Sequence, residues 1–413
     1  MKRALPIIVL SVVAAAAACA DTNDEPPTPT VDPDASVQAP ASDAGVTPEA
    51  SAEAGADTGA EAAAPPTCND DGWCLVALPN PRSIGVKNFR PIGLAMDGPG
   101  SVWAASYSFP VADGDTTSHI LHYENGTWNV VYGIGPNQPG PLPYTLVALA
   151  SNDAGALLAV GMASSYNVYP RPAAVVRVEN GKAIEEHPDG IQELVSVGFT
   201  SATDAWALDN EGRLYKTTIG GDGPLVWAEQ ESPHQPPPSG FPRGASLMFV
   251  STDKKLVLFG EDSSVWPSRL YVDRQMDDGS WVTTFLPDGF FSITTGVSSA
   301  PDALWLAGTS FLGATGLPSA PDAGEPVWTS TPAQFDWVPR ALWARSENDV
   351  WSVGDVGRVF HFDGTAWKDA ALALGSVPMT VEYLNSITGW PATGEMWVGG
   401  ESVVMHYTPK GTP

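Results

Sequence analysis

The stretch that decides the fold is DVWSVGDVGRVFHFDGTAW, at Asp349–Trp367. Its valine, phenylalanine and tryptophan residues favour strands, because branched and aromatic side chains pack well on a pleated surface. The glycines and the Asp-Gly pair between these runs are typical of tight turns. We therefore expect two strands joined by a turn, a second turn, and the start of a third strand. This is one unit of an up-and-down antiparallel sheet.

The same unit recurs along the chain. Clear copies contain Ser101–Trp103 with His122–Trp128 and Glu395–Gly399 with His406–Tyr407, and further copies begin at Ala205–Asp209, Ala303–Gly308, Leu158–Gly161 and Val257–Gly260. The units are anchored at positions 103, 158, 206, 257, 305, 351 and 397, about 50 residues apart. A period of this length with several short strands per copy predicts a β-propeller. The expected fold class is all-β, with seven four-stranded antiparallel blades.

Each blade is assigned strands A to D from the axis outwards. The A strands are expected at 92–96, 145–150, 194–200, 246–251, 292–298, 340–345 and 383–388. Strand B carries the anchor, strand C a His-Tyr or His-Phe pair, and strand D a tryptophan after a glycine turn. Packing between blades is the expected role of the anchor tryptophans, since such side chains bury large apolar areas. These are Trp103, Trp206, Trp305, Trp351 and Trp397.

The last unit ends at Tyr407 without an outermost strand, whereas Trp73–Pro79 has an outer-strand pattern with no preceding strands. We expect this N-terminal segment to pair with the last blade and close the ring, because closure removes an open sheet edge. Cys68 and Cys74 bracket the turn at its start, and in an exported chain such a pair is expected to form a disulfide. A metal site would need further ligands, and none lies close in sequence.

Residues 1–19 have the pattern of an export signal, with a positive flank, an apolar run and three alanines before Cys19. The apolar run is too short for a membrane-spanning helix. The segment resembles a bacterial lipoprotein signal peptide with a lipobox, although Ala16 stands where leucine is commonest. The resemblance implies that Cys19 becomes the lipidated N-terminus that anchors the mature chain, and Ala20 then implies export to the outer membrane. The alternative is ordinary secretion after an Ala-x-Ala site.

Residues 20–66 form a compositionally distinct segment of Ala, Pro, Asp, Glu, Ser, Thr and Gly, with no aromatic residue and no Lys or Arg. Such a segment cannot bury enough apolar surface to offset the entropy of ordering, so it is expected to be disordered. Its like charges repel and extend it, which favours a tether between a lipid and a folded domain. The expected domains are thus a signal peptide at 1–19, a tether at 20–66 and a propeller at 67–413.

The chain is strongly acidic. It contains 47 Asp and Glu residues against 20 Lys and Arg, and its formal net charge is −27. This charge argues against nucleic acid or an anionic membrane as an electrostatic partner, and favours solubility outside the cytoplasm.

The loops predicted on the two faces of the ring differ in length. All A-to-B turns are short, whereas several B-to-C and D-to-A connections are long and contain aromatic residues. Long loops on a rigid scaffold usually carry the function, and aromatic side chains suit sugars or extended peptides. The candidate ligand-binding residues are Tyr107, Phe109, Tyr166, Tyr169, Trp266, Phe311, Phe241, Phe290, Phe335 and Trp337. The alternative is that these aromatic side chains cover the ends of the blades.

Motifs that carry chemistry are scarce. His122, His361 and His406 occupy one repeat position, so we interpret them as framework residues. Asp113 and Asp115 lie in a long loop and could offer oxygen ligands to calcium, but the further ligands of a full calcium loop are missing. Nucleophile elbows, zinc-protease motifs, phosphate-binding loops and dinucleotide fingerprints do not occur. We expect no cofactor, no metal and no catalytic residue.

The turns at Asp363–Trp367 and Asn125–Trp128 resemble relaxed forms of the Asp-box of sialidases and related propellers. The kelch repeat fits less well, because its glycine doublets are absent except at Gly399-Gly400. Taken whole, the chain resembles propeller-type lipoproteins of unassigned function on Gram-negative surfaces. That resemblance covers signal, tether and repeats, and it implies a scaffold without implying an activity.

Two functions follow as hypotheses. The first is a non-catalytic binding module, monomeric and lipid-anchored in the outer membrane of the cell envelope, on its periplasmic or surface side, which presents its aromatic loops to a glycan or a protein. The alternative is a glycan hydrolase or lyase with a pocket on the same face, which uses loop carboxylates such as Asp113, Asp115, Glu261 and Asp262. A hydrolase of this kind would need two carboxyl groups at a fixed separation across a pocket.

Overall fold

The computed structural model describes residues 67–84, 86–108, 117–133, 144–152, 154–163, 172–221, 223–233, 245–262, 268–290, 293–308, 310–318, 324–331, 338–370, 372–374 and 377–410. The predicted signal peptide and tether lie outside this part of the chain, as do Asp113 and Asp115.

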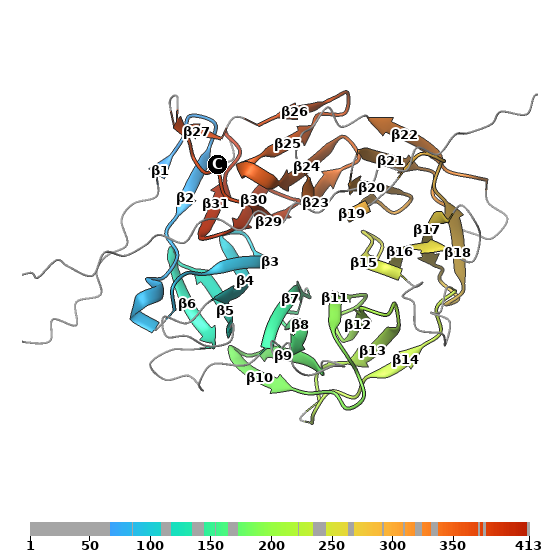
Figure 1. The fold of residues 1–413 in the computed structure, drawn as a ribbon, viewed down its shortest axis with the longest axis horizontal. Helices are drawn as coiled ribbons and strands as arrows, with labels where there is room; N and C mark the ends of the chain where they lie inside the picture. The colour runs from blue at the N-terminus through green and yellow to red at the C-terminus, as the bar shows by residue number, and fades with distance from the viewer. Residues whose placement is uncertain are drawn as a thin grey trace, which may run out of the picture. The chain divides into compact units, whose positions relative to one another are not determined.

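Within the described residues the strands form seven antiparallel blades around an axis (Figure 1). Blade 1 contains β3 (Arg90–Gly98), β4 (Ser101–Ser108), β5 (Thr117–Glu124) and β6 (Thr127–Tyr132). Blade 2 contains β7 (Tyr144–Ser151), β8 (Leu157–Ala163), β9 (Ala173–Glu179) and β10 (Lys182–Glu186). Blade 3 contains β11 (Leu194–Phe199), β12 (Asp204–Asp209), β13 (Leu214–Thr218) and β14 (Ala228–Gln230). Blade 4 contains β15 (Ala245–Val250), β16 (Leu256–Asp262), β17 (Arg269–Gln275) and β18 (Trp281–Phe285).

The remaining blades follow the same order. Blade 5 contains β19 (Ile293–Ala300), β20 (Ala303–Gly308), β21 (Phe311–Thr315) and β22 (Val327–Thr331). Blade 6 contains β23 (Pro339–Ser346), β24 (Asp349–Gly354), β25 (Val359–Phe362) and β26 (Trp367–Asp369). Blade 7 contains β29 (Leu384–Trp390), β30 (Glu395–Gly400) and β31 (Val403–Tyr407). Every predicted A strand is confirmed to within a few residues.

Blade 7 is completed by the N-terminal segment, as predicted. Strand β2 (Trp73–Val76) pairs antiparallel with β31, with Trp73 opposite Tyr407, and β1 (Thr67–Cys68) adds a fifth strand outside it. In Figure 1, β2 lies beside β31, the last strand of the chain. The Cys68–Cys74 disulfide joins β1 to β2 across one register pair.

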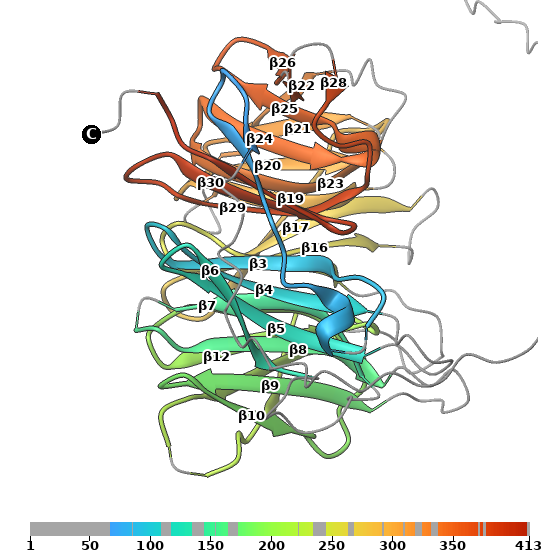
Figure 2. The same cartoon turned by 90° about the vertical axis from the view of Figure 1, so that its left-hand side faces the viewer.

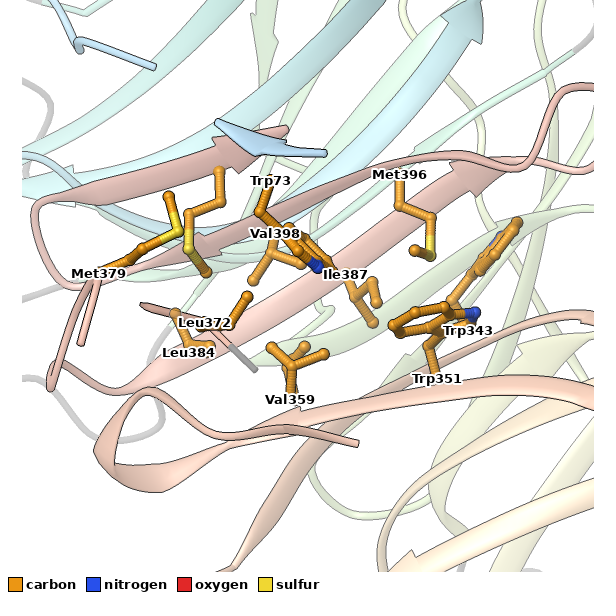
Figure 3. Close-up of a cluster of buried hydrophobic side chains, with 12 residues drawn as sticks. Trp73, Trp343, Trp351, Val359, Leu372, Met379, Leu384, Ile387, Met396 and Val398 are labelled. Carbon is orange, nitrogen blue, oxygen red and sulfur yellow. The ribbon is translucent and has the colours of Figure 1, made fainter. Parts of the chain in front are cut away.

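Apolar side chains fill the spaces between neighbouring blades. Figure 3 shows the cluster between blades 6 and 7, where Trp73 meets Trp351 edge-on with ring centroids 6.0 Å apart. Trp73 is 1% exposed, and all five anchor tryptophans are buried, which confirms their predicted packing role. Burying the ring-closing tryptophan here contributes on the order of 2–3 kcal/mol.

One strand assignment was wrong. We expected Phe311 in a long B-to-C loop, but it begins strand C of blade 5, and the long connection follows that strand. The error arose because blade 5 has Gly313 opposite Trp305, where the clear copies have the histidine that identifies strand C. Phe311 is fully buried and stacks on Trp367 of blade 6 at 3.8 Å, so it belongs to the core and is not available to a ligand.

The ring has two faces, and Figure 2 shows it edge-on. The short A-to-B turns lie on one face, here called the turn face. The A strands begin on the other, here called the rim face, after the 3-10 helix η1 (Pro81–Ile84) in blade 1 and the hairpin of β27 (Ala373–Leu374) and β28 (Val377–Pro378) in blade 7. Among the described residues, none forms a helix long and apolar enough to span a membrane.

Candidate functional site

A basic residue stands opposite the anchor in six of the seven blades, which only the strand register reveals. The residues on strand C at this position are His122, Arg177, Lys216, Arg274, His361 and His406, with Gly313 in blade 5. Each basic side chain has an acidic neighbour; Lys216, for example, lies 2.9 Å from Asp204 and Arg274 lies 2.6 Å from Asp253. Sequence reasoning found only the histidines, because Arg and Lys fill the same position elsewhere.

In blades 6 and 7 this pair is built into a three-residue unit. Trp351 Nε1 donates to Asp349 at 2.8 Å, the same carboxylate oxygen lies 2.9 Å from His361 Nε2, and the imidazole stacks on the indole at 4.0 Å. Burial alone would raise the pKa of the Asp349 carboxyl, but the hydrogen bonds from His361 and Trp351 outweigh it and lower the pKa.

Glu395 makes the equivalent unit with Trp397 and His406, and it also accepts a hydrogen bond from the backbone of Gly100 in blade 1. Burial alone would raise the pKa of the Glu395 carboxyl, but the hydrogen bonds from His406 and Trp397 outweigh it and lower the pKa. The three repeat histidines are therefore framework residues, as predicted: each stacks on an anchor tryptophan and pairs with an acid.

The rim face offers a different set of polar side chains, close to the axis. Arg90 is the first residue of β3, and its guanidinium lies 3.2 Å from the Tyr107 hydroxyl and 3.1 Å from Glu401 of blade 7. The hydrogen bond to Tyr107 and the nearby charges of Glu401 and Glu382 raise the pKa of Arg90. The guanidinium is therefore held as a cation beside a phenol.

Blade 6 repeats this arrangement with other residues. Arg340, near the start of β23, pairs with Asp355, and its guanidinium lies 4.8 Å from the centre of the Tyr383 ring. The backbone N–H of Glu401 donates to the Tyr383 carbonyl at 3.0 Å, which joins this group to Arg90. We call the continuous set Asp355, Arg340, Tyr383, Glu401, Arg90 and Tyr107 the rim row. It crosses blades 6, 7 and 1, where the N-terminal strand closes the ring.

The rim row can do three things chemically. Its arginines can bind carboxylates or carbonyl oxygens, its tyrosines can stack on flat or apolar groups, and its acids can bind cations. The described residues hold no group of three or more His, Cys, Asp or Glu side chains placed to bind a metal ion.

Most predicted ligand-binding residues cannot be placed. Tyr107 belongs to the rim row, and Phe290 is half-buried against the core between blades 4 and 5. Phe311 is buried, as described above. The other seven, Phe109, Tyr166, Tyr169, Trp266, Phe241, Phe335 and Trp337, lie outside the described residues. The arginines of the rim row were not predicted, because no local motif brings them together.

Two hollows lie on the turn face. The axial opening has a volume of about 420 Å³ and a mixed lining, with apolar residues such as Phe199 and Phe249 and polar ones such as Thr252 and Lys254. A second hollow of about 830 Å³ lies over blades 1 to 3, where Asp97, Glu124 and Glu179 line it.

These features define a seven-bladed β-propeller in which six blades carry a basic-acidic pair beside the anchor and the rim face carries Arg and Tyr side chains. No protein-family model matches the chain, and no curated protein matches its sequence. Solved structures share the fold at low sequence identity.

Three solved structures illustrate the likeness. YCF48 bound to D1 peptide has a TM-score of 0.55 at 14% identity, covering 84% of this chain and 99% of that one. YCF48 from Cyanidioschyzon merolae has a TM-score of 0.56 at 13% identity, covering 83% and 100%. A catalytically inactive virginiamycin B lyase from Staphylococcus aureus with quinupristin has a TM-score of 0.56 at 14% identity, covering 81% and 98%. At such identities the likeness shows the fold alone.

Proposed function

We propose that this protein is a non-catalytic binding module of the bacterial cell envelope, and that the rim face of its propeller holds a protein or glycan ligand. The observation that carries the proposal is the rim row, which places two arginines and two tyrosines side by side near the axis. Such groups supply hydrogen bonds and flat apolar surface to a ligand.

Proteins of this fold include both binding proteins and enzymes, since YCF48 with a bound peptide and virginiamycin B lyase are equally similar to this chain. The choice of a binding role therefore rests on the rim row, because a rigid scaffold can present such side chains to a partner.

The proposal includes a lipid anchor at Cys19, with the chain held at the outer membrane as a monomer. It rests on the cysteine that follows three alanines and on the acidic tether that separates it from the propeller. Expression in a Gram-negative host with radiolabelled palmitate tests it. We expect label in the wild-type chain and none in Cys19→Ser; label in both variants, or in neither, would contradict lipidation at this residue.

A glycan hydrolase or lyase is the second candidate, and the hollow of about 830 Å³ with its three carboxylates favours it. This hollow is not the pocket expected from sequence, because it lies on the turn face and is lined by other carboxylates. Glu261 and Asp262 end β16 of blade 4, and Asp113 and Asp115 lie outside the described residues.

One experiment separates the two candidates. The full-length chain with Cys19→Ser, which avoids the lipid, is tested on peptide and glycan arrays and in a hydrolysis screen on the same glycans. We expect binding that weakens about tenfold in Arg90→Ala or Arg340→Ala, and no turnover. Turnover of any glycan at a catalytic rate would overturn the non-catalytic assignment. Binding that is unchanged in both variants would show that the rim row is not the binding site.

A further inference from the structure

Exposed apolar side chains gather at one place on the rim face. The described part of the chain contains eight large exposed apolar residues, of which five belong to blade 6 or to the connection into blade 7. Val377 lies in the β27–β28 hairpin, whereas the other four come from the stretches that the backbone hydrogen bonds below join. These four are Val338, Val356, Val381 and Tyr383, which are 46%, 55%, 68% and 44% exposed, respectively. We call these four residues the valine patch. Scattered exposed valines need no explanation, whereas a cluster marks an interaction surface.

Backbone hydrogen bonds hold the patch together. Asp355, next to Val356, donates its N–H to the Val338 carbonyl at 3.3 Å, and Gly357 donates to the Glu382 carbonyl at 2.8 Å. The turn that carries Val356 is thus tied on one side to the start of β23 and on the other to the segment between Val381 and Tyr383. The patch is a preformed surface built from three separate stretches of sequence.

Val356 adopts a conformation that its residue type disfavours. Its φ is 52° and its ψ is 36°, in the left-handed region where a branched side chain is strained. Glycine would fit this backbone without strain, and Gly357 beside it already has a positive φ. An exposed valine here adds nothing to the core. Its strained conformation therefore points to a role of the side chain in contact with a binding partner.

The charges around the patch indicate what covers it. The arginines near the patch, Arg340, Arg358 and Arg90, are paired with Asp355, Asp369 and Glu401. Glu382 lies within the patch sequence and is exposed, and its charge acts on Arg90 without a direct ion pair. The chain as a whole carries −27, which disfavours a second copy of itself. The chain's own tether is acidic and has no Lys or Arg, so like charges also disfavour the tether as the segment that covers the patch. A basic partner is the complementary one.

We propose that the valine patch docks an extended peptide segment of another protein, in which an apolar side chain is followed or preceded within two residues by Lys or Arg. The apolar side chain covers Val356 and Val381, and the basic one pairs with Glu382. This rests on the proposed binding function and names its ligand class. Valine side chains offer no hydrogen bonds to sugar hydroxyls, so the patch favours peptide over glycan.

Selection from a displayed library of random 12-residue peptides tests the proposal. The full-length chain with Cys19→Ser is the bait, and the best peptides are synthesised and titrated against variants. We expect enriched peptides to contain the apolar-basic pair, and their Kd to rise about tenfold in Val356→Gly and Val381→Ser and several-fold in Glu382→Gln. Val226→Ser and Val327→Ser are matched controls, since these valines are 78% and 66% exposed and lie in blades 3 and 5.

Val356→Gly separates binding from folding, because it relieves strain and should not lower the melting temperature. Peptides that bind Val356→Gly and Val381→Ser as tightly as wild type would overturn the proposal. So would enriched peptides that lack Lys and Arg. If peptides instead lose affinity only in Arg90→Ala or Arg340→Ala, the binding function stands and the valine patch is not the site. If neither peptides nor glycans bind, both proposals fall.

Discussion

His119 is fully buried in strand β5, where its Nδ1 atom lies 2.9 Å from the Ser108 hydroxyl and its ring meets Phe89 edge-on. Burial removes water from the imidazole and lowers its pKa to about 4. Since Ser108 pairs with one ring nitrogen and burial excludes water, the imidazole of His119 is neutral in the folded protein at pH 7.

The pH dependence of stability should therefore carry a signature of His119. The pKa of His119 in the unfolded chain is near 6.5. Below that pH its imidazole is protonated in the unfolded chain but stays neutral in the folded protein. Stability is full above pH 6.5 and falls as the pH drops towards 4, by on the order of 3 kcal/mol. Denaturant titrations of wild type and His119→Asn at pH 7, 5.5 and 4 measure how much of the loss in unfolding free energy is due to His119. Parallel losses in the two proteins would contradict this assignment.

Glu395 gives a second test of how stability depends on pH. Its carboxylate accepts from Trp397, His406 and the backbone of Gly100, so Glu395→Gln leaves donors without an anion. We expect a loss of about 1–3 kcal/mol at pH 7, compared with no measurable change in the exposed control Glu347→Gln. Because the folded pKa is lowered, this stabilisation is full above the unfolded pKa of the carboxyl and disappears as the pH falls through the folded one. A difference that persists unchanged at pH 3 would contradict the charge argument.

Among the elements, β1 and β2 form a disulfide-linked hairpin at the outer edge of blade 7. The Cys68–Cys74 bond closes a loop with a sequence separation of 6, for which chain entropy gives a stabilisation of about 2 kcal/mol. We expect Cys68→Ser with Cys74→Ser to lower the melting temperature by a few degrees, as measured by calorimetry, and to leave the seven blades folded. An unchanged melting temperature would show that the hairpin contributes little to ring closure.

The elements that sequence predicts well are those that repeat. All seven A strands and the ring-closing strand follow from one pattern, because each copy must fill the same position between its neighbours. Strand C of blade 5 was missed, since Gly313 replaces the expected basic residue there.

The rim row could not be predicted from sequence. Arg90 and Arg340 are about 250 residues apart and belong to no repeat position that stands out, so only ring closure brings them to one edge. The valine patch was missed for a related reason, because exposed valines in a β protein look like ordinary strand residues until backbone hydrogen bonds show them together.

At the scale of the whole molecule, a strand from the start of the described chain closes the ring. Blade 7 supplies Tyr383 and Glu401 to the rim row, between Arg340 of blade 6 and Arg90 of blade 1. If β2 did not pair with β31, blade 7 would have an open edge, and the contact of Trp73 with Trp351 and Tyr407 would be lost. Closure therefore positions the proposed site as well as stabilising the fold.

Hydrogen exchange of the segment Val403–Tyr407 tests this claim most directly, comparing the full-length chain with a chain that lacks residues 67–76. Strand β31 lies between β30 and β2, so its amides should be protected in the full chain and exchange much faster in the shortened one. The A strand of blade 3, β11, serves as the internal reference and should change little. Equal protection of Val403–Tyr407 in both chains would contradict closure by the N-terminal strand.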